Sequence, residues 1–303
     1  MADLRVSIAG IELSNPVITA SGTFGFGDEY GEYYNLDELG AIAVKGLTLL
    51  PREGNKSPRI AETPGGILNS VGLQNPGVEY FVYAELPKLR RHTAKIIANM
   101  AGNTIEEYCE MATILSASDV DMLEMNISCP NVKAGGVAFG TNAKTVEQIT
   151  NEVRKYAKKP LIVKLSPNVT DIADIAKAAE AGGADALSMI NTILGMSIDI
   201  NTCKPVLANN VGGMSGPCVR PVAVRMVWQA ANAVKIPIVG MGGIARYEDA
   251  IEFILAGASA VAVGTGMFKN PMLPIDVKLG VNKYLDNRGI PSVNDIVGKV
   301  VLN

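Results

Sequence analysis

Eight short apolar segments recur along the chain, and they constrain its fold more than any other feature of the sequence. They are rich in Val, Ile, Leu and Ala and are bounded by Pro, Gly, Asp or Asn, as is typical of strands buried on both faces. The segments span residues 16–20, 41–45, 95–99, 121–126, 160–164, 185–191, 236–243 and 259–266, and helical patterns at 104–118, 145–157, 171–183 and 246–258 separate several of them. This alternation of strand and helix predicts an α/β fold, a parallel (β/α)8 or TIM barrel.

The spacing of the strands predicts where additional structure lies. Residues 4–14 are expected to form a β-hairpin with a turn near Ala9 and Gly10, which plugs the bottom of the barrel. The longest gaps follow the second, fourth and sixth strands, so insertions at 46–76, 127–144 and 191–219 should rise over the barrel mouth. Loops that follow the strands build the active sites of such barrels. No domain boundary interrupts the pattern, and residues 1–303 are predicted to form a single domain.

Composition and residue counts exclude several functional classes. A net charge of −3 provides no basic field for a nucleic-acid backbone. His92 is the only histidine and directly precedes a strand, so zinc sites with two histidine ligands are excluded, and any histidine-dependent dyad would have to use it. No C-x-x-C pair occurs among Cys109, Cys129, Cys203 and Cys218, and we predict no metal centre within the chain. Without a secretory signal or an apolar run of about 18 residues, the protein is expected to be cytoplasmic.

Polar side chains end five of the apolar segments: Lys45, Asn99, Asn126, Lys164 and Asn191. Because the carboxyl ends of parallel barrel strands meet at one face, we expect these side chains to converge there. Amides both donate and accept hydrogen bonds, so they can hold a planar ring that carries carbonyl and N–H groups. Lysines can hold an anion or stabilise negative charge that develops on a ring. The sequence therefore predicts a polar ligand site at the barrel mouth.

Glycine motifs follow the last two strands, GMGGIA at 240–245 and GTGMF at 264–268. In barrels, the corresponding loops commonly bind phosphate through backbone N–H groups, and glycine lets the backbone approach closely. GMGGIA also matches the dinucleotide pattern G-x-G-x-x-A, but no βαβ unit with a suitably placed acidic residue follows it. We therefore predict a phosphate-bearing cofactor or substrate at these two loops.

Cys129 follows the fourth strand, in the segment NISCPNVKAGGVAFGTN at 126–142. Gly135 and Gly136 in this segment provide the hinge that a lid over the barrel mouth would need. With no histidine within reach, Cys129 is predicted to act as a general base rather than as a histidine-activated nucleophile. A thiol with the reference pKa of about 8.5 predicts activity that rises toward alkaline pH.

Taken together, these segments resemble the class 1 dihydroorotate dehydrogenases, and within them the type 1B catalytic subunits. The resemblance spans nearly the whole chain and rests on TASGTFGFG (19–27), VKGLTLLPREGNKSPRIAETPGGILNSVGLQNPG (44–77), NISCPNVKAGGVAFG (126–140), INT (190–192), Gly216, GMGGI (240–244) and GTGMF (264–268). GILNSVGLQNPG together with NISCPNVKAGG is similar to type 1B rather than to the fumarate-using type 1A. The membrane class would carry serine in place of Cys129 and a hydrophobic N-terminal extension.

The resemblance implies a single FMN-binding barrel domain that oxidises (S)-dihydroorotate to orotate in pyrimidine biosynthesis. It implies that FMN contacts Ser21, Lys45, Gly46, Asn99, Asn126, Lys164, Ile190, Gly216, Gly242, Gly243, Gly264 and Thr265. It likewise implies that the substrate contacts Lys45, Asn69, Ser70, Val71, Gly72, Leu73, Asn126, Asn191 and Thr192. Cys129 would take the C5 proton while hydride passes from C6 to FMN N5, and Lys45 and Lys164 would assist catalysis.

The type 1B resemblance also implies an electron-transfer subunit that carries FAD and a [2Fe–2S] cluster and reduces NAD⁺, in a heterotetramer of two catalytic and two electron-transfer subunits. Dihydropyrimidine dehydrogenase is similar in its flavin barrel and loop cysteine, but its chain is far longer and has cluster-binding cysteines. A non-redox lyase or isomerase acting on a sugar phosphate could use Lys164 as a Schiff-base amine. A non-catalytic binding subunit would not need the polar rim. Bound flavin distinguishes these classes, because it is yellow whereas a Schiff-base aldolase is colourless.

Overall fold

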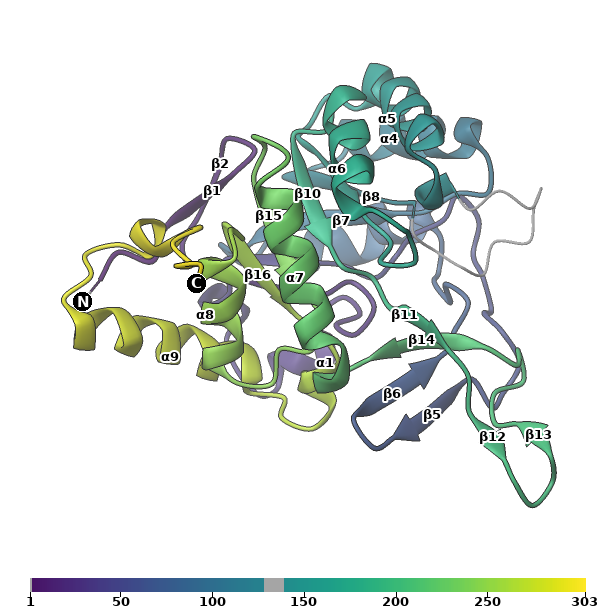
Figure 1. Cartoon of the computed structure of the whole chain (residues 1–303). Coiled ribbons are helices and arrows are strands. Elements are labelled where there is room, and N and C mark those ends of the chain that lie inside the picture. The colour runs from purple at the N-terminus through teal and green to yellow at the C-terminus, as the bar shows by residue number, and fades with distance from the viewer. Residues whose placement is uncertain (1, 128–138) are drawn as a thin grey trace.

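The computed structural model describes residues 2–127 and 139–303, and at its centre is a closed barrel of eight parallel strands (Figure 1). In chain order the barrel strands are β3 (Val17–Thr19), β4 (Ala41–Ala43), β7 (Lys95–Met100), β8 (Met122–Asn126), β9 (Leu161–Lys164), β10 (Ala186–Met189), β15 (Ile238–Met241) and β16 (Ala260–Val263). Each strand pairs with the next one in this series, and β16 pairs with β3 to close the barrel. The predicted (β/α)8 fold is confirmed.

Helices follow most of the barrel strands and surround the barrel. The longer ones are α4 (Ile105–Ala117), α5 (Ala143–Tyr156), α6 (Ile172–Ala181), α7 (Arg220–Ala231), α8 (Tyr247–Leu255) and α9 (Leu273–Arg288). Shorter turns are α1 (Asp28–Gly31), η1 (Leu36–Glu38), α2 (Val78–Tyr80), the π-helical η2 (Phe81–Glu85), α3 (Leu86–Leu89), η3 (Phe139–Thr141), η4 (Pro217–Val219), η5 (Thr265–Phe268) and η6 (Val293–Ile296). Polar side chains fix where helices begin: Thr104, Asn142 and Asp171 each accept a backbone N–H in the first turn of α4, α5 and α6.

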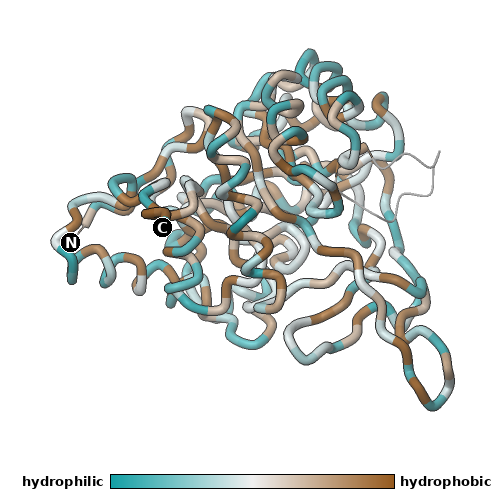
Figure 2. The backbone as a smooth tube through the Cα atoms, in the orientation of Figure 1, coloured by the Kyte–Doolittle hydropathy of each residue, from teal (hydrophilic) through white to brown (hydrophobic). Residues whose placement is uncertain are grey.

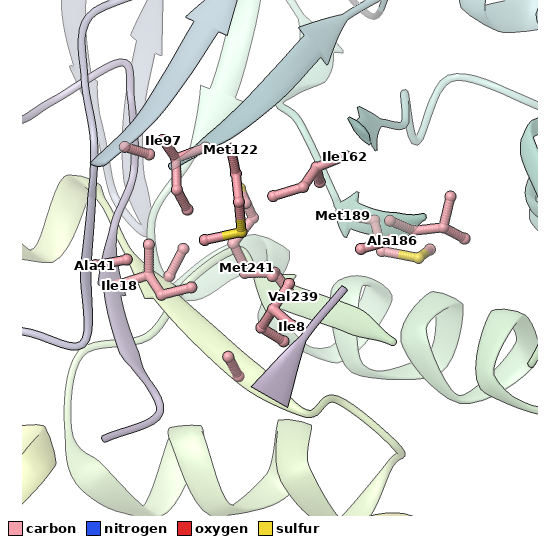
Figure 3. Packing of buried hydrophobic residues seen from close by; sticks show 14 of the residues in the cluster. Ile8, Ile18, Ala41, Ile97, Met122, Ile162, Ala186, Met189, Val239 and Met241 are labelled. Atoms are coloured by element: carbon pink, nitrogen blue, oxygen red, sulfur yellow. The ribbon is translucent and has the colours of Figure 1, made fainter. Parts of the chain in front are cut away.

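The barrel and its helices share an aliphatic core. In Figure 2 the central strands are mostly hydrophobic, whereas the helices alternate between hydrophobic and hydrophilic residues. Ile97, Met122 and Ile162, from three neighbouring strands, lie close together among the buried side chains (Figure 3). Aromatic residues make up only 5% of the chain, so Val, Ile, Leu, Met and Ala fill most of this space.

The N-terminal hairpin lies at the amino end of the barrel, as predicted. β1 (Val6–Ile8) pairs antiparallel with β2 (Ile11–Leu13), and the turn between them consists of Ala9 and Gly10, both with positive φ. Ile8 is fully buried and belongs to the same hydrophobic core as Val239 of β15 (Figure 3). Because β2 leads directly into β3, the hairpin covers the end of the barrel opposite to the loops that follow the strands.

Two insertions that are far apart in sequence form one sheet over the carboxyl end of the barrel, and we call it the roof sheet. β5 (Ile60–Thr63) and β6 (Gly66–Asn69) come from the insertion after β4, and β11 (Ile193–Gly195) and β14 (Gly212–Ser215) come from the insertion after β10. They pair in the order β11–β14–β6–β5. The hairpin of β12 (Ile198–Asp199) and β13 (Lys204–Pro205) projects from this sheet, away from both chain ends (Figure 1). The insertions were predicted, but their pairing was not.

Candidate active site

A cavity of about 270 Å³ lies between the carboxyl ends of the barrel strands and the roof sheet. A water molecule needs only about 10–15 Å³ of such volume, so the cavity accommodates a much larger ligand. All five polar residues that end the apolar segments line it: Lys45, Asn99, Asn126, Lys164 and Asn191. The predicted convergence of these side chains at the barrel mouth is therefore confirmed.

Most residues that the sequence resemblance assigns to ligands also line the cavity. They are Ser21, Lys45, Gly46, Asn69, Val71, Gly72, Leu73, Asn99, Asn126, Lys164, Ile190, Asn191, Thr192, Gly242, Gly243, Gly264 and Thr265. Ser70 and Gly216 are not among the lining residues, although Ser70 is fully buried between two that are. Cys129 lies outside the described residues, so its place over the mouth stays a prediction, as do the individual ligand contacts.

Apart from Asn69 of β6, the lining residues that the roof sheet contributes were not predicted from the sequence. Ile60 and Ile67 come from β5 and β6, whereas Met214 and Ser215 come from β14. The Thr265 hydroxyl donates a 2.8 Å hydrogen bond to Ser215 Oγ, which ties the roof sheet to the loop after β16. No local pattern marks these residues, because only the pairing of two distant insertions brings them to the cavity.

A buried ion pair lies at the floor of the cavity. Lys164 Nζ is 3.7 Å from Glu124 Oε2 and donates a 3.4 Å hydrogen bond to Ser21 Oγ. The side chains of Lys164 and Glu124 are only 5% and 4% exposed, and such a pair is stable only if further hydrogen bonds satisfy it. Ser188 Oγ donates to Glu124 Oε1 at 2.6 Å, and Asn99 Nδ2 donates to Oε2. Each oxygen of the Glu124 carboxylate therefore accepts a hydrogen bond.

Glu124 was not predicted as a site residue, although the sequence contains a signal for it. This residue is charged, yet it lies within the apolar segment 121–126 and two positions before Asn126. Alternate residues of a strand share one face, so Glu124 and Asn126 point to the same side of β8. The register places Asn99 opposite Glu124 and Lys164 opposite Asn126. A polar layer beneath the strand ends could therefore have been inferred.

Lys45 follows β4 and provides a second cation to the cavity. Burial lowers the pKa of its ammonium below the usual lysine value, and the neighbouring Arg59 guanidinium lowers it further. An anionic group bound beside Lys45 would oppose both effects and favour the charged ammonium. The site is therefore suited to a ligand that carries a carboxylate or an electron-rich ring.

The amide groups at the ends of β8 and β10 are held by neighbouring groups. Asn191 Nδ2 lies 3.5 Å from Asn126 Oδ1, and Asn191 Oδ1 accepts a 2.8 Å hydrogen bond from the Thr192 N–H. The Tyr108 hydroxyl donates a 2.7 Å hydrogen bond to the Asn126 carbonyl. Amides fixed in this way present donors and acceptors in set directions, as recognition of a planar ring with carbonyl and N–H groups requires.

The loop after β15 approaches the cavity through two glycines that lack room for a side chain. A Cβ on Gly243 would lie 2.7 Å from the Gly216 carbonyl oxygen and 2.9 Å from the Arg220 nitrogen, and φ is +83°. A Cβ on Gly242 would lie 3.0 Å from the Ala223 Cβ, at a φ of +124°. The backbone itself therefore forms this part of the cavity wall, as a phosphate cradle requires.

Gly243→Ala is expected to lower the free energy of unfolding by about 1–3 kcal/mol, because a side chain at this positive φ is strained and overlaps its neighbours. The measurement is urea unfolding of the protein without added ligand. Gly31→Ala is the matched control: a Cβ there meets nothing within 4 Å, and a change of at most about 0.5 kcal/mol is expected. Equal stability of the two variants would contradict the tight packing around Gly243.

Comparison with known proteins establishes the family of the chain. Residues 3–285 match the family model described as "Dihydroorotate dehydrogenase". The chain belongs to the dihydroorotate dehydrogenase family. The resemblance drawn from the sequence motifs is thereby confirmed.

Relatives within the dihydroorotate dehydrogenase family cover nearly the whole chain. It is 61% identical over 298 residues to "Dihydroorotate dehydrogenase B (NAD(+)), catalytic subunit" of Alkaliphilus metalliredigens, a match that covers 98% of this chain and 99% of the relative. The protein of the same name from Thermoanaerobacter pseudethanolicus is 56% identical, with the same coverage. The crystal structure of DHODH in complex with ferulenol from Eimeria tenella has a TM-score of 0.80 at 23% identity, covers 98% of this chain and 88% of its own, and supports the fold.

Among the residues that the structure describes, features outside the cavity do not suggest a second chemical site. His92 precedes β7 at the amino end of the barrel, where its Nδ1 lies 3.4 Å from Asp37 Oδ1. Within residues 2–127 and 139–303, no group of three or more His, Cys, Asp or Glu side chains is arranged to hold a metal ion. No helix in the same residues has both the length and the apolar character to cross a membrane.

Proposed function

We propose that this chain is an FMN-dependent oxidoreductase that converts (S)-dihydroorotate to orotate in pyrimidine biosynthesis. The observation that carries the proposal is the cavity at the barrel mouth, which combines two lysines, fixed amides and a glycine-lined wall. Two relatives named dihydroorotate dehydrogenase are identical to this chain at more than half of the aligned positions. Family and cavity chemistry therefore point to the same reaction.

Two observations on the cavity support FMN as its cofactor. Gly242 and Gly243 line the cavity without side chains, so their backbone can approach a phosphate there. Asn99 Oδ1 is buried and has no hydrogen-bond partner in the described part of the chain, so it can accept from an N–H of a ring. We propose that the ring end is held by Ser21, Lys45, Gly46, Asn99, Asn126, Lys164 and Ile190, and the phosphate end by Gly216, Gly242, Gly243, Gly264 and Thr265.

In the proposed oxidation, the substrate loses a proton from C5 and a hydride from C6. Residues of this chain bind and orient the ligands and stabilise charge. When bound, FMN supplies the oxidising capacity by accepting that hydride. Lys164 holds a buried ammonium at the cavity floor, where it stabilises negative charge on the ring. We propose that Lys45 binds the substrate carboxylate and that Asn126 and Asn191 orient the substrate ring. Residues 69–73 and Thr192 complete the proposed substrate contacts.

We propose that Cys129 is the general base that removes the C5 proton. The proposal rests on its place in the sequence, three residues after the end of β8, and on the family resemblance. Removal of a proton by a positioned base contributes typically about 10²- to 10⁴-fold to a rate. Cys129 is therefore the residue whose loss should affect turnover most.

We also propose that a second subunit carries the electrons onward to NAD⁺. The names of the relatives contain both "NAD(+)" and "catalytic subunit", which supports a division of the reaction between two kinds of subunit. This sequence has no C-x-x-C pair for a cluster and no second nucleotide motif that fits its surroundings. A partner with FAD and a [2Fe–2S] cluster, in a heterotetramer with two copies of each subunit, would supply both.

The proposed function is tested by the visible absorption spectrum of the purified chain, recorded before and after anaerobic addition of dihydroorotate. A yellow protein is expected, and its flavin bands should bleach when dihydroorotate is added. Orotate is the matched control, because it is already oxidised and should shift the bands without bleaching them. A colourless chain that takes up no FMN, or a flavin that dihydroorotate leaves oxidised, would rule the proposal out.

A further inference from the structure

The amide of Asn99 has only one orientation that its surroundings allow. A carboxylate accepts hydrogen bonds and cannot donate, so the Asn99 atom that faces Glu124 Oε2 must be Nδ2. Asn99 Oδ1 then points toward Gly46, where an added Cβ would lie 2.9 Å from it. Gly46 lines the cavity, and Oδ1 is buried without a hydrogen-bond partner among the described residues. A ligand in the cavity must therefore supply a donor to this oxygen.

Glu124 is well placed to enforce this orientation. Its side chain is 4% exposed and is not among those that line the cavity, so it acts from beneath the floor. Ser188 donates to its other oxygen, and the Lys164 ammonium lies 3.7 Å from the oxygen that Asn99 binds. Asn99, Glu124, Lys164 and Ser188 come from β7, β8, β9 and β10, which are successive neighbours in the barrel. The arrangement is thus built into the barrel rather than into a loop.

We propose that Glu124 is a positioning residue that directs the Asn99 oxygen into the cavity and anchors the Lys164 ammonium beside it. The site then offers one fixed acceptor and one cation to the ligand. This inference rests on the proposed function, because an oxidised flavin ring has a single N–H group and carbonyl oxygens on either side of it. An acceptor and a cation in fixed positions match that edge of the ring, whereas a rotated Asn99 amide would present a second donor.

Glu124→Met tests the proposal, since methionine has a similar length but no acceptor oxygen. The FMN dissociation constant is expected to rise about ten-fold or more, because Asn99 loses the group that orients it. Glu124→Gln keeps an oxygen that can accept the Asn99 hydrogen bond but loses the negative charge that pairs with Lys164. A smaller rise of the FMN dissociation constant, about three-fold, is therefore expected. The dissociation constants are obtained by titrating flavin-free protein with FMN and following the quenching of flavin fluorescence.

Two controls separate positioning from a general effect on the fold. Glu85 is also a buried glutamate paired with a lysine, 2.9 Å from Lys88 Nζ, but it lies in η2 and its partner is a half-exposed lysine rather than a residue that lines the cavity. Glu85→Met is therefore expected to change the FMN dissociation constant by less than about two-fold. In an Asn99→Ala background, Glu124→Met should have a clearly smaller effect than in the wild type, about three-fold at most, because no amide is left to orient.

Folded Glu124→Met protein that binds FMN as tightly as the wild type overturns the proposal. An equal effect of Glu124→Met with and without Asn99 overturns it as well, since Glu124 would then not act through that amide. If thermal unfolding shows that Glu124→Met does not fold, Glu124→Gln carries the test, and an unchanged dissociation constant again overturns the proposal. A wild-type chain that binds no FMN would instead contradict the proposed function, so the two failures are distinguishable.

Discussion

Cys129→Ala is expected to slow the reduction of bound flavin by dihydroorotate about 10²- to 10⁴-fold, because the variant lacks the base that removes the C5 proton. FMN and orotate should still bind, since the other proposed contacts come from the barrel strands, the loops that follow them and the roof sheet. Anaerobic stopped-flow measurement of flavin bleaching reports this step directly. In the wild type the rate should rise toward alkaline pH as the thiol, with a reference pKa of about 8.5, becomes a thiolate.

Two further variants test the assignment of the base. Cys129→Ser should retain slightly more activity than Cys129→Ala, because a hydroxyl remains at the same position. Cys203→Ala is the matched control, since Cys203 is exposed in the hairpin between β12 and β13 and is remote from the proposed chemistry. A Cys129→Ala rate within a factor of a few of the wild-type rate would show that another group removes the proton.

The isolated chain is expected to be reduced by dihydroorotate yet to reduce NAD⁺ barely at all. Electrons that reach the flavin have no further carrier in this sequence, which lacks a cluster-binding cysteine pair. An artificial dye should accept them, because it needs only to reach the cavity from solvent. Addition of the electron-transfer partner should restore NAD⁺ reduction. The measurement is steady-state turnover with NAD⁺, with fumarate and with a dye, with and without the partner.

The three electron acceptors distinguish between a type 1B subunit, a type 1A enzyme and a chain that needs no partner. Rapid NAD⁺ reduction by the chain alone would remove the need for a second subunit. Rapid fumarate reduction would move the chain to type 1A, in spite of its GILNSVGLQNPG segment. Failure of the dye as well as of NAD⁺ would indicate that the flavin is not reduced, and the defect would then lie in the first half of the reaction.

The barrel could be predicted because its physical cause is local. Each strand is a short apolar segment that must be buried on both faces, and the residue that ends it must face the barrel mouth. Lys45 and Asn99 were therefore placed at the cavity by their positions alone, and the structure confirms these positions. The glycines of the last two loops were found for the same reason, since their spacing relative to β15 and β16 is fixed.

What the sequence did not predict depends on contacts between distant segments. Ile67 and Met214 line the cavity only because β6 pairs with β14, and no pattern within either segment specifies that pairing. Glu124 was overlooked because a charged residue in a strand is usually exposed, whereas here it accepts two hydrogen bonds and pairs with the Lys164 ammonium. The pairing of β6 with β14 and the contacts of Glu124 both depend on residues that are distant in sequence and meet only in the folded protein.

The closure of the barrel between β16 and β3 has a consequence for how the protein folds while it is being synthesised. Val17 pairs with Val261, so the first barrel strand has no partner on one edge until nearly the whole chain has left the ribosome. At roughly 5–20 residues per second, that interval is on the order of tens of seconds. The cavity wall at Gly243 is likewise completed late in synthesis. The nascent chain therefore becomes able to bind its prosthetic group only at the end of translation, and an exposed strand edge must be protected until then.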